Sequence, residues 1–186
     1  MLNTKKIILV TGAASSGKSE FAEVLAAKTN KTVIYVATAK VDTTDQEWQI
    51  KIKQHQQRRP QNWQTFEVSE QLSSTIEQAL SSECLLIDSL GTWVANFLIL
   101  EPSEWKARHD RLLSSLKLTN ATVIMVSEET GWGVVPAYPA GRLFRDRLGS
   151  LSRQISNLDN TTTYLVACGH ILNLSLLGEP LSNYEI

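Results

Sequence analysis

The clearest chemical signal in this sequence is a segment of eight residues rich in glycine, alanine and serine. A lysine in this pattern adds positive charge near the β- and γ-phosphates of a nucleotide, and a final serine hydroxyl is suited to Mg²⁺. The glycines let backbone N–H groups turn toward phosphate oxygens. The segment reads G-x-x-x-x-G-K-S and consists of Gly12, Ala13, Ala14, Ser15, Ser16, Gly17, Lys18 and Ser19. It predicts a nucleoside triphosphate site, and the alternative is a glycine- and serine-rich turn without function.

The residues on both sides of this segment favour the nucleotide site. An apolar, β-branched run occupies 7–11, and a helical pattern follows from Gly17 onward. A strand, a phosphate loop and a helix in this order direct the positive end of the helix at the phosphates. We therefore expect a triphosphate site here rather than a simple turn.

A second candidate is the carboxylate at the end of another apolar run. The residues Cys-Leu-Leu-Ile at 84–87 precede Asp88, as in a buried strand that delivers an acid to its exposed end. Phosphoryl transfer needs such a carboxylate to hold Mg²⁺, directly or through water. The alternative is that Asp88 caps the helix that begins after it. With the phosphate loop present, Ser19 and Asp88 are the predicted metal ligands.

A basic segment at 51–67 contains His55, followed by Arg58 and Arg59. A neutral imidazole is a nucleophile near pH 7, and it forms a phosphoramidate when it attacks the α-phosphorus of a nucleotide. Neighbouring arginines would bind the phosphates. From the residues alone, a surface histidine among solvated charges is the alternative.

Composition limits the class of protein. The chain has 186 residues, of which 42% are hydrophobic and 20% charged, and its formal net charge is −1. This predicts one globular domain over residues 1–186, and no general attraction to nucleic acid or to an anionic membrane. The apolar run before the loop is too short for a signal peptide or a membrane span. Cys84 and Cys168 lack metal-ligand spacing and are expected to be core thiols, so we expect a cytoplasmic protein.

Strand and helix patterns alternate along the chain. Predicted strands occupy 6–11, 32–37, 84–88, 122–127 and 162–168, and predicted helices occupy 17–28, 45–58, 69–81, 90–100, 103–116 and 140–158. Alternation after a phosphate loop predicts an α/β fold with a mostly parallel sheet between layers of helices. Ligands of such sheets bind at the carboxyl ends of the strands.

Several longer strings carry a resemblance to a known family. They are H-x-x-x-R-P-x-x-W-x-T-x-E at 55–67, L-I-D-S-L-G-T-W at 86–93 followed by Asn96, E-T-G-W-G-V-V-P at 129–136 and G-R-L-F-R-D-R-L-G at 141–149. Together with the phosphate loop, they resemble the bifunctional adenosylcobinamide kinase/adenosylcobinamide-phosphate guanylyltransferase of cobalamin biosynthesis. The resemblance extends over nearly the whole chain, and its longer strings are more specific than the phosphate loop.

The resemblance implies a RecA-like P-loop NTPase fold and two reactions in one domain. ATP or GTP phosphorylates adenosylcobinamide, and GMP then passes from GTP to the resulting phosphate, giving adenosyl-GDP-cobinamide. It also implies that His55 carries the GMP, that Glu67 joins Asp88 near the metal, and that the chain forms a homotrimer. Arg58 and Arg59 are then phosphate ligands.

Departures from the family pattern bear on how the two activities are balanced. Ser15 stands where the family commonly has arginine, Glu128 where it has asparagine, and Arg153 where it has glutamine. Two other functions are therefore considered: a small-molecule kinase without the transferase step, and a non-catalytic nucleotide-binding regulatory module. A DNA-handling ATPase is disfavoured by the net charge. Trp93 and Trp132 are candidates for contact with the corrinoid, whereas Trp48 and Trp105 are expected to pack in the protein.

Overall fold

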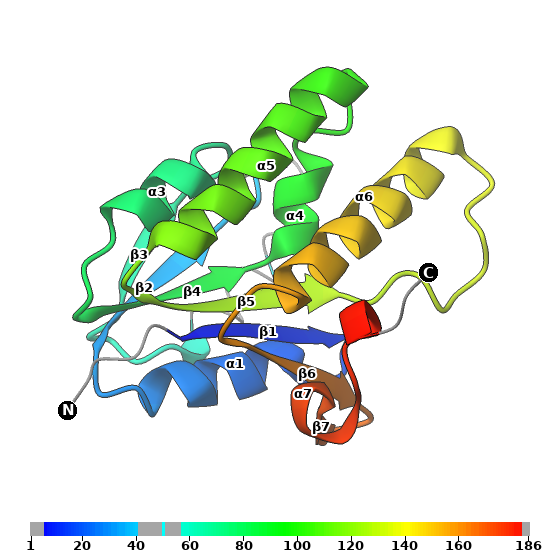
Figure 1. Cartoon of the computed structure of the whole chain (residues 1–186). Coiled ribbons are helices and arrows are strands. Elements are labelled where there is room, and N and C mark those ends of the chain that lie inside the picture. The colour runs from blue at the N-terminus through cyan, green and yellow to red at the C-terminus, as the bar shows by residue number, and fades with distance from the viewer. Residues whose placement is uncertain (1–5, 41–49, 51–56, 184–186) are drawn as a thin grey trace.

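A seven-stranded sheet forms the centre of the computed structural model, which describes residues 6–40, 50 and 57–183. The strand order is β3-β2-β4-β5-β1-β6-β7 (Figure 1). All neighbouring strands are parallel except the β6–β7 pair, which is antiparallel. The strands are β1 (Ile7–Gly12), β2 (Thr32–Ala37), β3 (Gln64–Glu67), β4 (Glu83–Asp88), β5 (Thr122–Glu128), β6 (Thr161–Ala167) and β7 (His170–Asn173).

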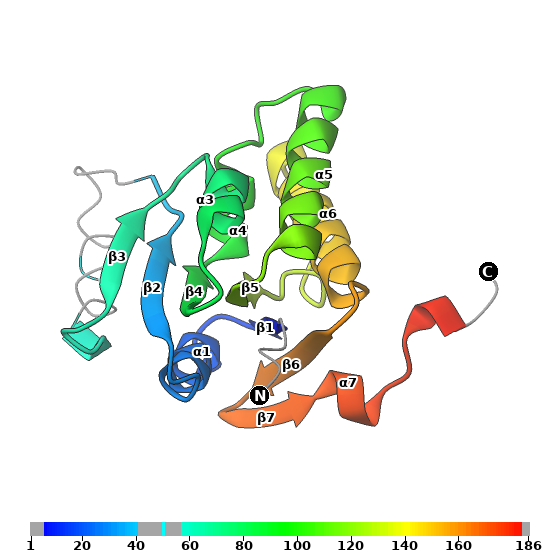
Figure 2. The same ribbon diagram turned by 60° about the vertical axis from the view of Figure 1, so that its left-hand side comes forward.

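Helices cover both faces of this sheet. Among the described helices, α1 (Lys18–Ala27) packs on one face, and α3 (Leu72–Gln78), α4 (Leu90–Ala95), α5 (Pro102–Leu118) and α6 (Pro139–Ser156) lie on the other (Figure 1). The short α7 (Leu174–Leu177) and a 3₁₀ turn (Leu181–Asn183) follow β7 at the edge of the sheet (Figure 2). The expected α/β fold with a mostly parallel sheet between helical layers is therefore confirmed.

Side chains of the central strands alternate between two cores. Ile7 and Leu9 of β1 belong to the larger core under α3, α4, α5 and α6, whereas Ile8 and Val10 belong to the smaller core under α1. Central strands buried on both faces read as continuous apolar runs, which is why the sequence pattern identified them.

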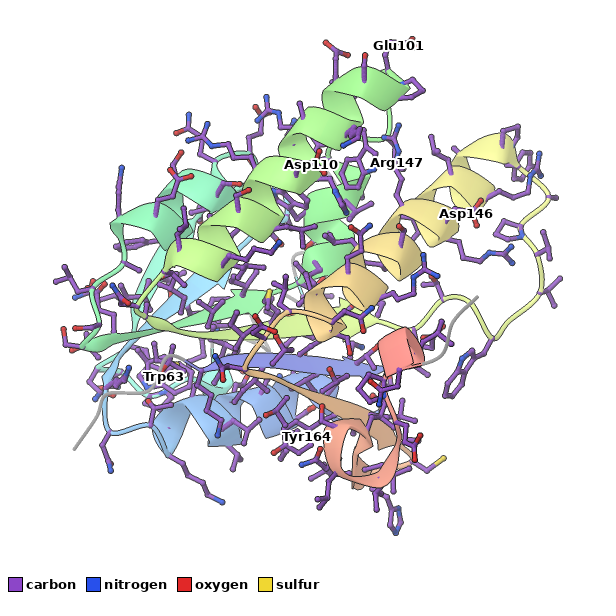
Figure 3. The ribbon with its side chains drawn as sticks, viewed as in Figure 1. Trp63, Glu101, Asp110, Asp146, Arg147 and Tyr164 are labelled. Carbon is purple, nitrogen blue, oxygen red and sulfur yellow. The ribbon has the colours of Figure 1, made fainter. Side chains whose placement is uncertain are left out.

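A buried arginine ties α6 to the neighbouring helices. The Arg147 guanidinium donates hydrogen bonds to the carbonyl oxygens of Phe97 (2.7 Å) and Leu100 (2.9 Å), and lies 4.9 Å from the ring centroid of Trp105. Figure 3 shows Arg147 pointing from α6 toward α5. These contacts satisfy the carbonyls just beyond α4, and Trp105 packs as expected from the sequence.

Some boundaries differ from the sequence prediction. The five predicted strands are present, but β3, β7 and α7 were not predicted, since they are short and largely exposed. Helix α4 ends at Ala95 rather than at 100, and the Asn96 side chain just after it donates to the carbonyl oxygens of Thr38 (2.8 Å) and Ser69 (2.9 Å). Of the predicted helix 45–58, the structure describes only Ile50, Gln57 and Arg58, all helical.

Two further expectations concern the cysteines and the membrane. Cys84 is buried, whereas Cys168 is exposed in the left-handed turn between β6 and β7, with φ 51°, so the prediction of a core position for Cys168 is wrong. None of the described helices is both long enough and apolar enough to cross a lipid bilayer.

Candidate nucleotide site at the carboxyl edge of the sheet

The phosphate loop joins β1 to α1 through two residues with left-handed backbone. Ser15 has φ 57° and Gly17 has φ 94°, and Gly17 is the N-cap of α1. Left-handed residues on either side of Ser16 turn successive N–H groups toward one concave surface, which suits a phosphate. The Ser16 side chain points inward, and its buried Oγ has no hydrogen-bond partner among the described residues. The loop therefore has the form expected of an anion cradle.

Gly12 is required by the close approach of β6. A Cβ added at Gly12 would lie 2.3 Å from the carbonyl oxygen of Val166 and 2.7 Å from Ser16 Oγ. The next strand therefore leaves no space for a side chain where the loop begins. The first glycine of the motif is explained by packing, and the second by its positive φ.

The charged and hydroxyl groups of the loop lie at the start of α1. Lys18 Nζ donates to the carbonyl oxygen of Ala13 at 3.2 Å, so the Lys18 side chain extends back across the loop. Ser19 lies in the first turn of α1 and is partly exposed. Ala13, Ala14 and Ser15 are exposed, so solvent reaches the outer side of the loop.

Asp88 ends β4 at the same edge of the sheet as the phosphate loop. Strand β5 lies between β1 and β4, so these two strands are two strand spacings apart, roughly 10 Å, and Gly12 lies two residues further along the sheet than Asp88. Glu67 ends β3, and its backbone is in register with Ala37, which is in turn in register with Asp88. The structure thus brings the predicted loop and both predicted acids to one edge.

A tyrosine that sequence reasoning did not assign to the site contacts Asp88. The Tyr35 hydroxyl donates to Asp88 Oδ2 at 2.9 Å, and burial, together with the charge of Asp88, raises the pKa of Tyr35. The Arg59 guanidinium carbon lies 3.2 Å from the centroid of the Tyr35 ring. The only signal in the sequence was the polar hydroxyl of Tyr35 within the apolar run of β2.

Hydrogen bonds also hold the residue after Asp88. Ser89 is the N-cap of α4, and it forms a capping box with Thr92. Ser89 Oγ donates to Glu128 Oε1 at 2.6 Å, and Thr38 Oγ1 donates to the Ser89 carbonyl oxygen at 2.6 Å. Because Ser89 performs the capping, the alternative role of Asp88 as a helix cap is wrong. Glu128 is one of the departures from the family pattern. Its carboxylate contacts the N-cap of α4 and does not extend into solvent.

The basic segment is only partly described. His55 lies outside the described residues. Arg58 forms ion pairs with Glu20 (2.6 Å) and Glu23 (3.3 Å) of α1, which direct its guanidinium toward that helix. Arg59 instead lies over Tyr35 beside Asp88. Roles for Arg58 and Arg59 as phosphate ligands stay predictions.

A cavity of about 260 Å³ lies between α6 and the carboxyl ends of β1 and β5. Its lining includes Thr11, Glu129, Arg145 and Arg153. Of the two tryptophans considered for corrinoid contact, Trp93 is 1% exposed in the larger core, so this candidate is wrong. Trp132 is 74% exposed on the loop before α6 and remains a candidate.

The donor set at this edge suits Mg²⁺. A serine hydroxyl from α1 and a carboxylate at the end of β4 supply the hard oxygen ligands that this ion prefers. The hydrogen bond from Tyr35 holds one carboxylate oxygen of Asp88 at the edge of the sheet. Ser19 and Asp88 therefore fit the metal that phosphoryl transfer needs.

Comparison with known proteins decides the family. The model of the cobinamide kinase / cobinamide phosphate guanyltransferase family matches residues 8–174. The chain belongs to this family. It is 38% identical to the bifunctional adenosylcobalamin biosynthesis protein CobP of Pseudomonas aeruginosa over 175 residues, covering 93% of this chain and 98% of the relative. It is 32% identical to the corresponding protein CobU of Escherichia coli, covering 87% of this chain and 96% of that relative.

The resemblance inferred from the motifs is therefore confirmed. The match includes the phosphate loop, the 55–67 string, Asp88 and the 129–149 strings. Among solved structures, a crystal structure of the RadB recombinase shares 14% sequence identity, with a TM-score of 0.44 and coverage of 86% of this chain and 73% of that chain. Membership of the cobinamide kinase family rests on the sequence matches.

Proposed function

We propose that this protein phosphorylates adenosylcobinamide with ATP or GTP and then transfers GMP from GTP to adenosylcobinamide phosphate. The product is adenosyl-GDP-cobinamide, and pyrophosphate leaves. The observation that carries the proposal is the phosphate loop and Asp88 at one edge of the sheet, in a chain that belongs to the cobinamide kinase family.

In the kinase step, the N–H groups of the loop and the Lys18 ammonium hold the triphosphate in line with the substrate hydroxyl. The hydroxyl oxygen attacks the γ-phosphorus, and the bond from that phosphorus to the β–γ bridging oxygen breaks. Mg²⁺ held by Ser19 and Asp88 would neutralise charge on the phosphate oxygens. Positioning and charge stabilisation are sufficient for this reaction.

In the transferase step, His55 is the nucleophile. Its ring nitrogen attacks the α-phosphorus of GTP and expels pyrophosphate, which leaves GMP joined to the imidazole. A phosphate oxygen of adenosylcobinamide phosphate then attacks the same phosphorus, and the phosphorus–nitrogen bond breaks. Arg58 and Arg59, which lie three and four residues beyond His55 in the sequence, would neutralise phosphate charge in this step.

Labelling with radioactive GTP tests the transferase step. We expect [α-³²P]GTP with Mg²⁺ to label the protein, and the adduct to be labile in acid and stable in base, as a phosphoramidate is. The variant His55→Ala should lose the label. The control His170→Ala changes an exposed histidine at the start of β7 and should keep it. A wild-type protein that takes up no label would refute the transferase step.

Product analysis by mass tests the kinase step. Wild-type protein should convert adenosylcobinamide and ATP to the phosphate, and Lys18→Ala should lose this activity together with the label from GTP. If phosphate forms but GDP-cobinamide does not, the protein is a kinase alone. If neither product forms although nucleotide binds, a non-catalytic regulatory module replaces both enzymatic functions.

Four further properties belong to the same proposal. We infer that Mg²⁺ is the metal, since Ser19 and Asp88 offer oxygen ligands, and that residues 1–186 act as one catalytic domain. The family resemblance supports a homotrimer and a cytoplasmic location. Light scattering after size-exclusion chromatography tests the trimer, and loss of label in EDTA that Mg²⁺ restores tests the metal.

A further inference from the structure

Tyr35 is a buried side chain next to the proposed metal ligand, and neither reaction step above uses it. It is 3% exposed, in the core beneath α1, and its hydroxyl donates to Asp88 Oδ2. In the sheet, Tyr35 is in register with Leu86, two residues before Asp88 on the neighbouring strand. Residues two apart lie on the same face, and a diagonal neighbour is within reach of an aromatic side chain. The contact is therefore built into the strand register.

The face of the Tyr35 ring contacts the basic segment. The Arg59 guanidinium carbon lies 3.2 Å from the ring centroid, and Arg59 Nε is buried without a hydrogen-bond partner among the described residues. A guanidinium over an aromatic face is attracted by the ring quadrupole. Tyr35 thus contacts the carboxylate through its hydroxyl and Arg59 through its ring face.

We propose that Tyr35 is a positioning residue that orients the Asp88 carboxylate for the metal and, through Arg59, links Asp88 to the segment that contains His55. The role of Asp88 as a metal ligand rests on the proposed function. The Tyr35 O–H donor limits rotation of the Asp88 carboxylate about its Cβ–Cγ bond. The stacked Arg59 guanidinium limits movement of the Tyr35 ring. Tyr35 then aligns Asp88, which acts in the kinase step, with Arg59, which acts in the transferase step.

A simple core role for Tyr35 makes a different prediction from a positioning role. If the ring only fills space, Tyr35→Phe keeps that packing and leaves metal binding unchanged. If the hydroxyl positions Asp88, the same variant lowers metal affinity, because loss of a hydrogen bond to a metal-binding group typically costs about tenfold or more. Phenylalanine has nearly the shape of tyrosine, so the variant tests the hydroxyl while the ring stays in place.

The experiment measures Mn²⁺ binding to the full-length protein in the presence of GDP, by electron paramagnetic resonance. We expect Tyr35→Phe to weaken Mn²⁺ affinity about tenfold, while GDP affinity in EDTA stays within about twofold. The matched control is Tyr164→Phe on β6, whose ring packs edge-on against Phe21 at 5.1 Å. This control should bind Mn²⁺ as the wild type does.

A double-mutant cycle tests the link through Arg59. Arg59→Lys keeps the charge but removes the planar group, so it should weaken Mn²⁺ binding in the wild type and have a smaller effect in the Tyr35→Phe background. Equal effects in both backgrounds would refute the link, and wild-type Mn²⁺ affinity in Tyr35→Phe would refute the positioning role. Because this assay needs neither cobinamide nor labelled histidine, a protein that takes up no label from GTP can still show the effect.

Discussion

The contact between Gly12 and β6 leads to a prediction about a single methyl group. In Gly12→Ala, the new Cβ would lie 2.3 Å from the Val166 carbonyl oxygen and 2.7 Å from Ser16 Oγ. Real Cβ atoms do not approach other atoms this closely, so the backbone must shift. Val166 cannot retreat easily, since β6 is hydrogen-bonded to β1 on one side and to β7 on the other. The substitution therefore forces movement at the point where the phosphate loop begins.

Overpacking of this kind costs about 1–3 kcal/mol of unfolding free energy. For a chain of 186 residues, each kcal/mol lowers Tm by about 2–4 °C, so Gly12→Ala should lower Tm by about 2–12 °C. The displaced loop should also bind nucleotide at least about tenfold more weakly, which corresponds to about 1.4 kcal/mol. Thermal unfolding and calorimetric titration with GDP measure the two effects.

Gly149→Ala is the matched control, because it makes the same chemical change within α6 without a clash. No atom lies within 4 Å of a Cβ added at Gly149, and the residue is exposed. Replacing glycine by alanine inside a helix stabilises the folded state by about 0.5–1 kcal/mol, so Tm should rise. If the two variants shift Tm in the same direction, or if Gly12→Ala keeps wild-type Tm and GDP affinity, the steric argument is wrong.

Three further predictions concern a buried cation and the two thiols. Arg147→Met should lower the unfolding free energy in urea by about 1–3 kcal/mol, because the Leu100 carbonyl loses its donor whereas the Phe97 carbonyl still accepts from the Leu100 N–H; an unchanged value would contradict this. Burial raises the pKa of the Cys84 thiol from 9.0 to about 11, so the folded state keeps a proton that the unfolded chain loses. Stability should therefore fall between pH 9 and 11, by an amount on the order of 2–3 kcal/mol, and Cys84→Ala should remove that part of the slope. Under native conditions a thiol reagent should modify the exposed Cys168 and leave Cys84 intact, and Cys168→Ser should abolish the fast reaction.

The strands and the phosphate loop were predictable because their signals are local. Residues of β1, the loop and the start of α1 are contiguous in the chain, and the apolar runs of β2, β4 and β5 are buried on both faces. Strand β3 was missed because its four residues, Gln-Thr-Phe-Glu, are all exposed and show no apolar pattern. β7 was missed because it has only four residues, three of them exposed, and its two apolar residues are too few to form a pattern.

The site was predictable only where a single residue type carries the chemistry. Asp88 was found because a carboxylate ends an apolar strand, and the longer sequence strings are specific enough to identify the family. The contact of the Arg58 side chain with α1 was not predictable, because its partners Glu20 and Glu23 are more than thirty residues away in the chain. The same holds for Glu128, whose partner Ser89 lies 39 residues earlier.

By itself, the sequence determined the nucleotide loop, the acid that ends β4 and the family, since each depends on residue type and spacing along the chain. Only the tertiary structure decided that β5 separates β1 from β4, that Trp93 is buried in the core and that Tyr35 contacts both Asp88 and Arg59. The physical reason is that strand order and register set contacts between distant residues. Tyr35 and Asp88 are 53 positions apart in sequence, yet parallel pairing of β2 with β4 places the hydroxyl 2.9 Å from the carboxylate.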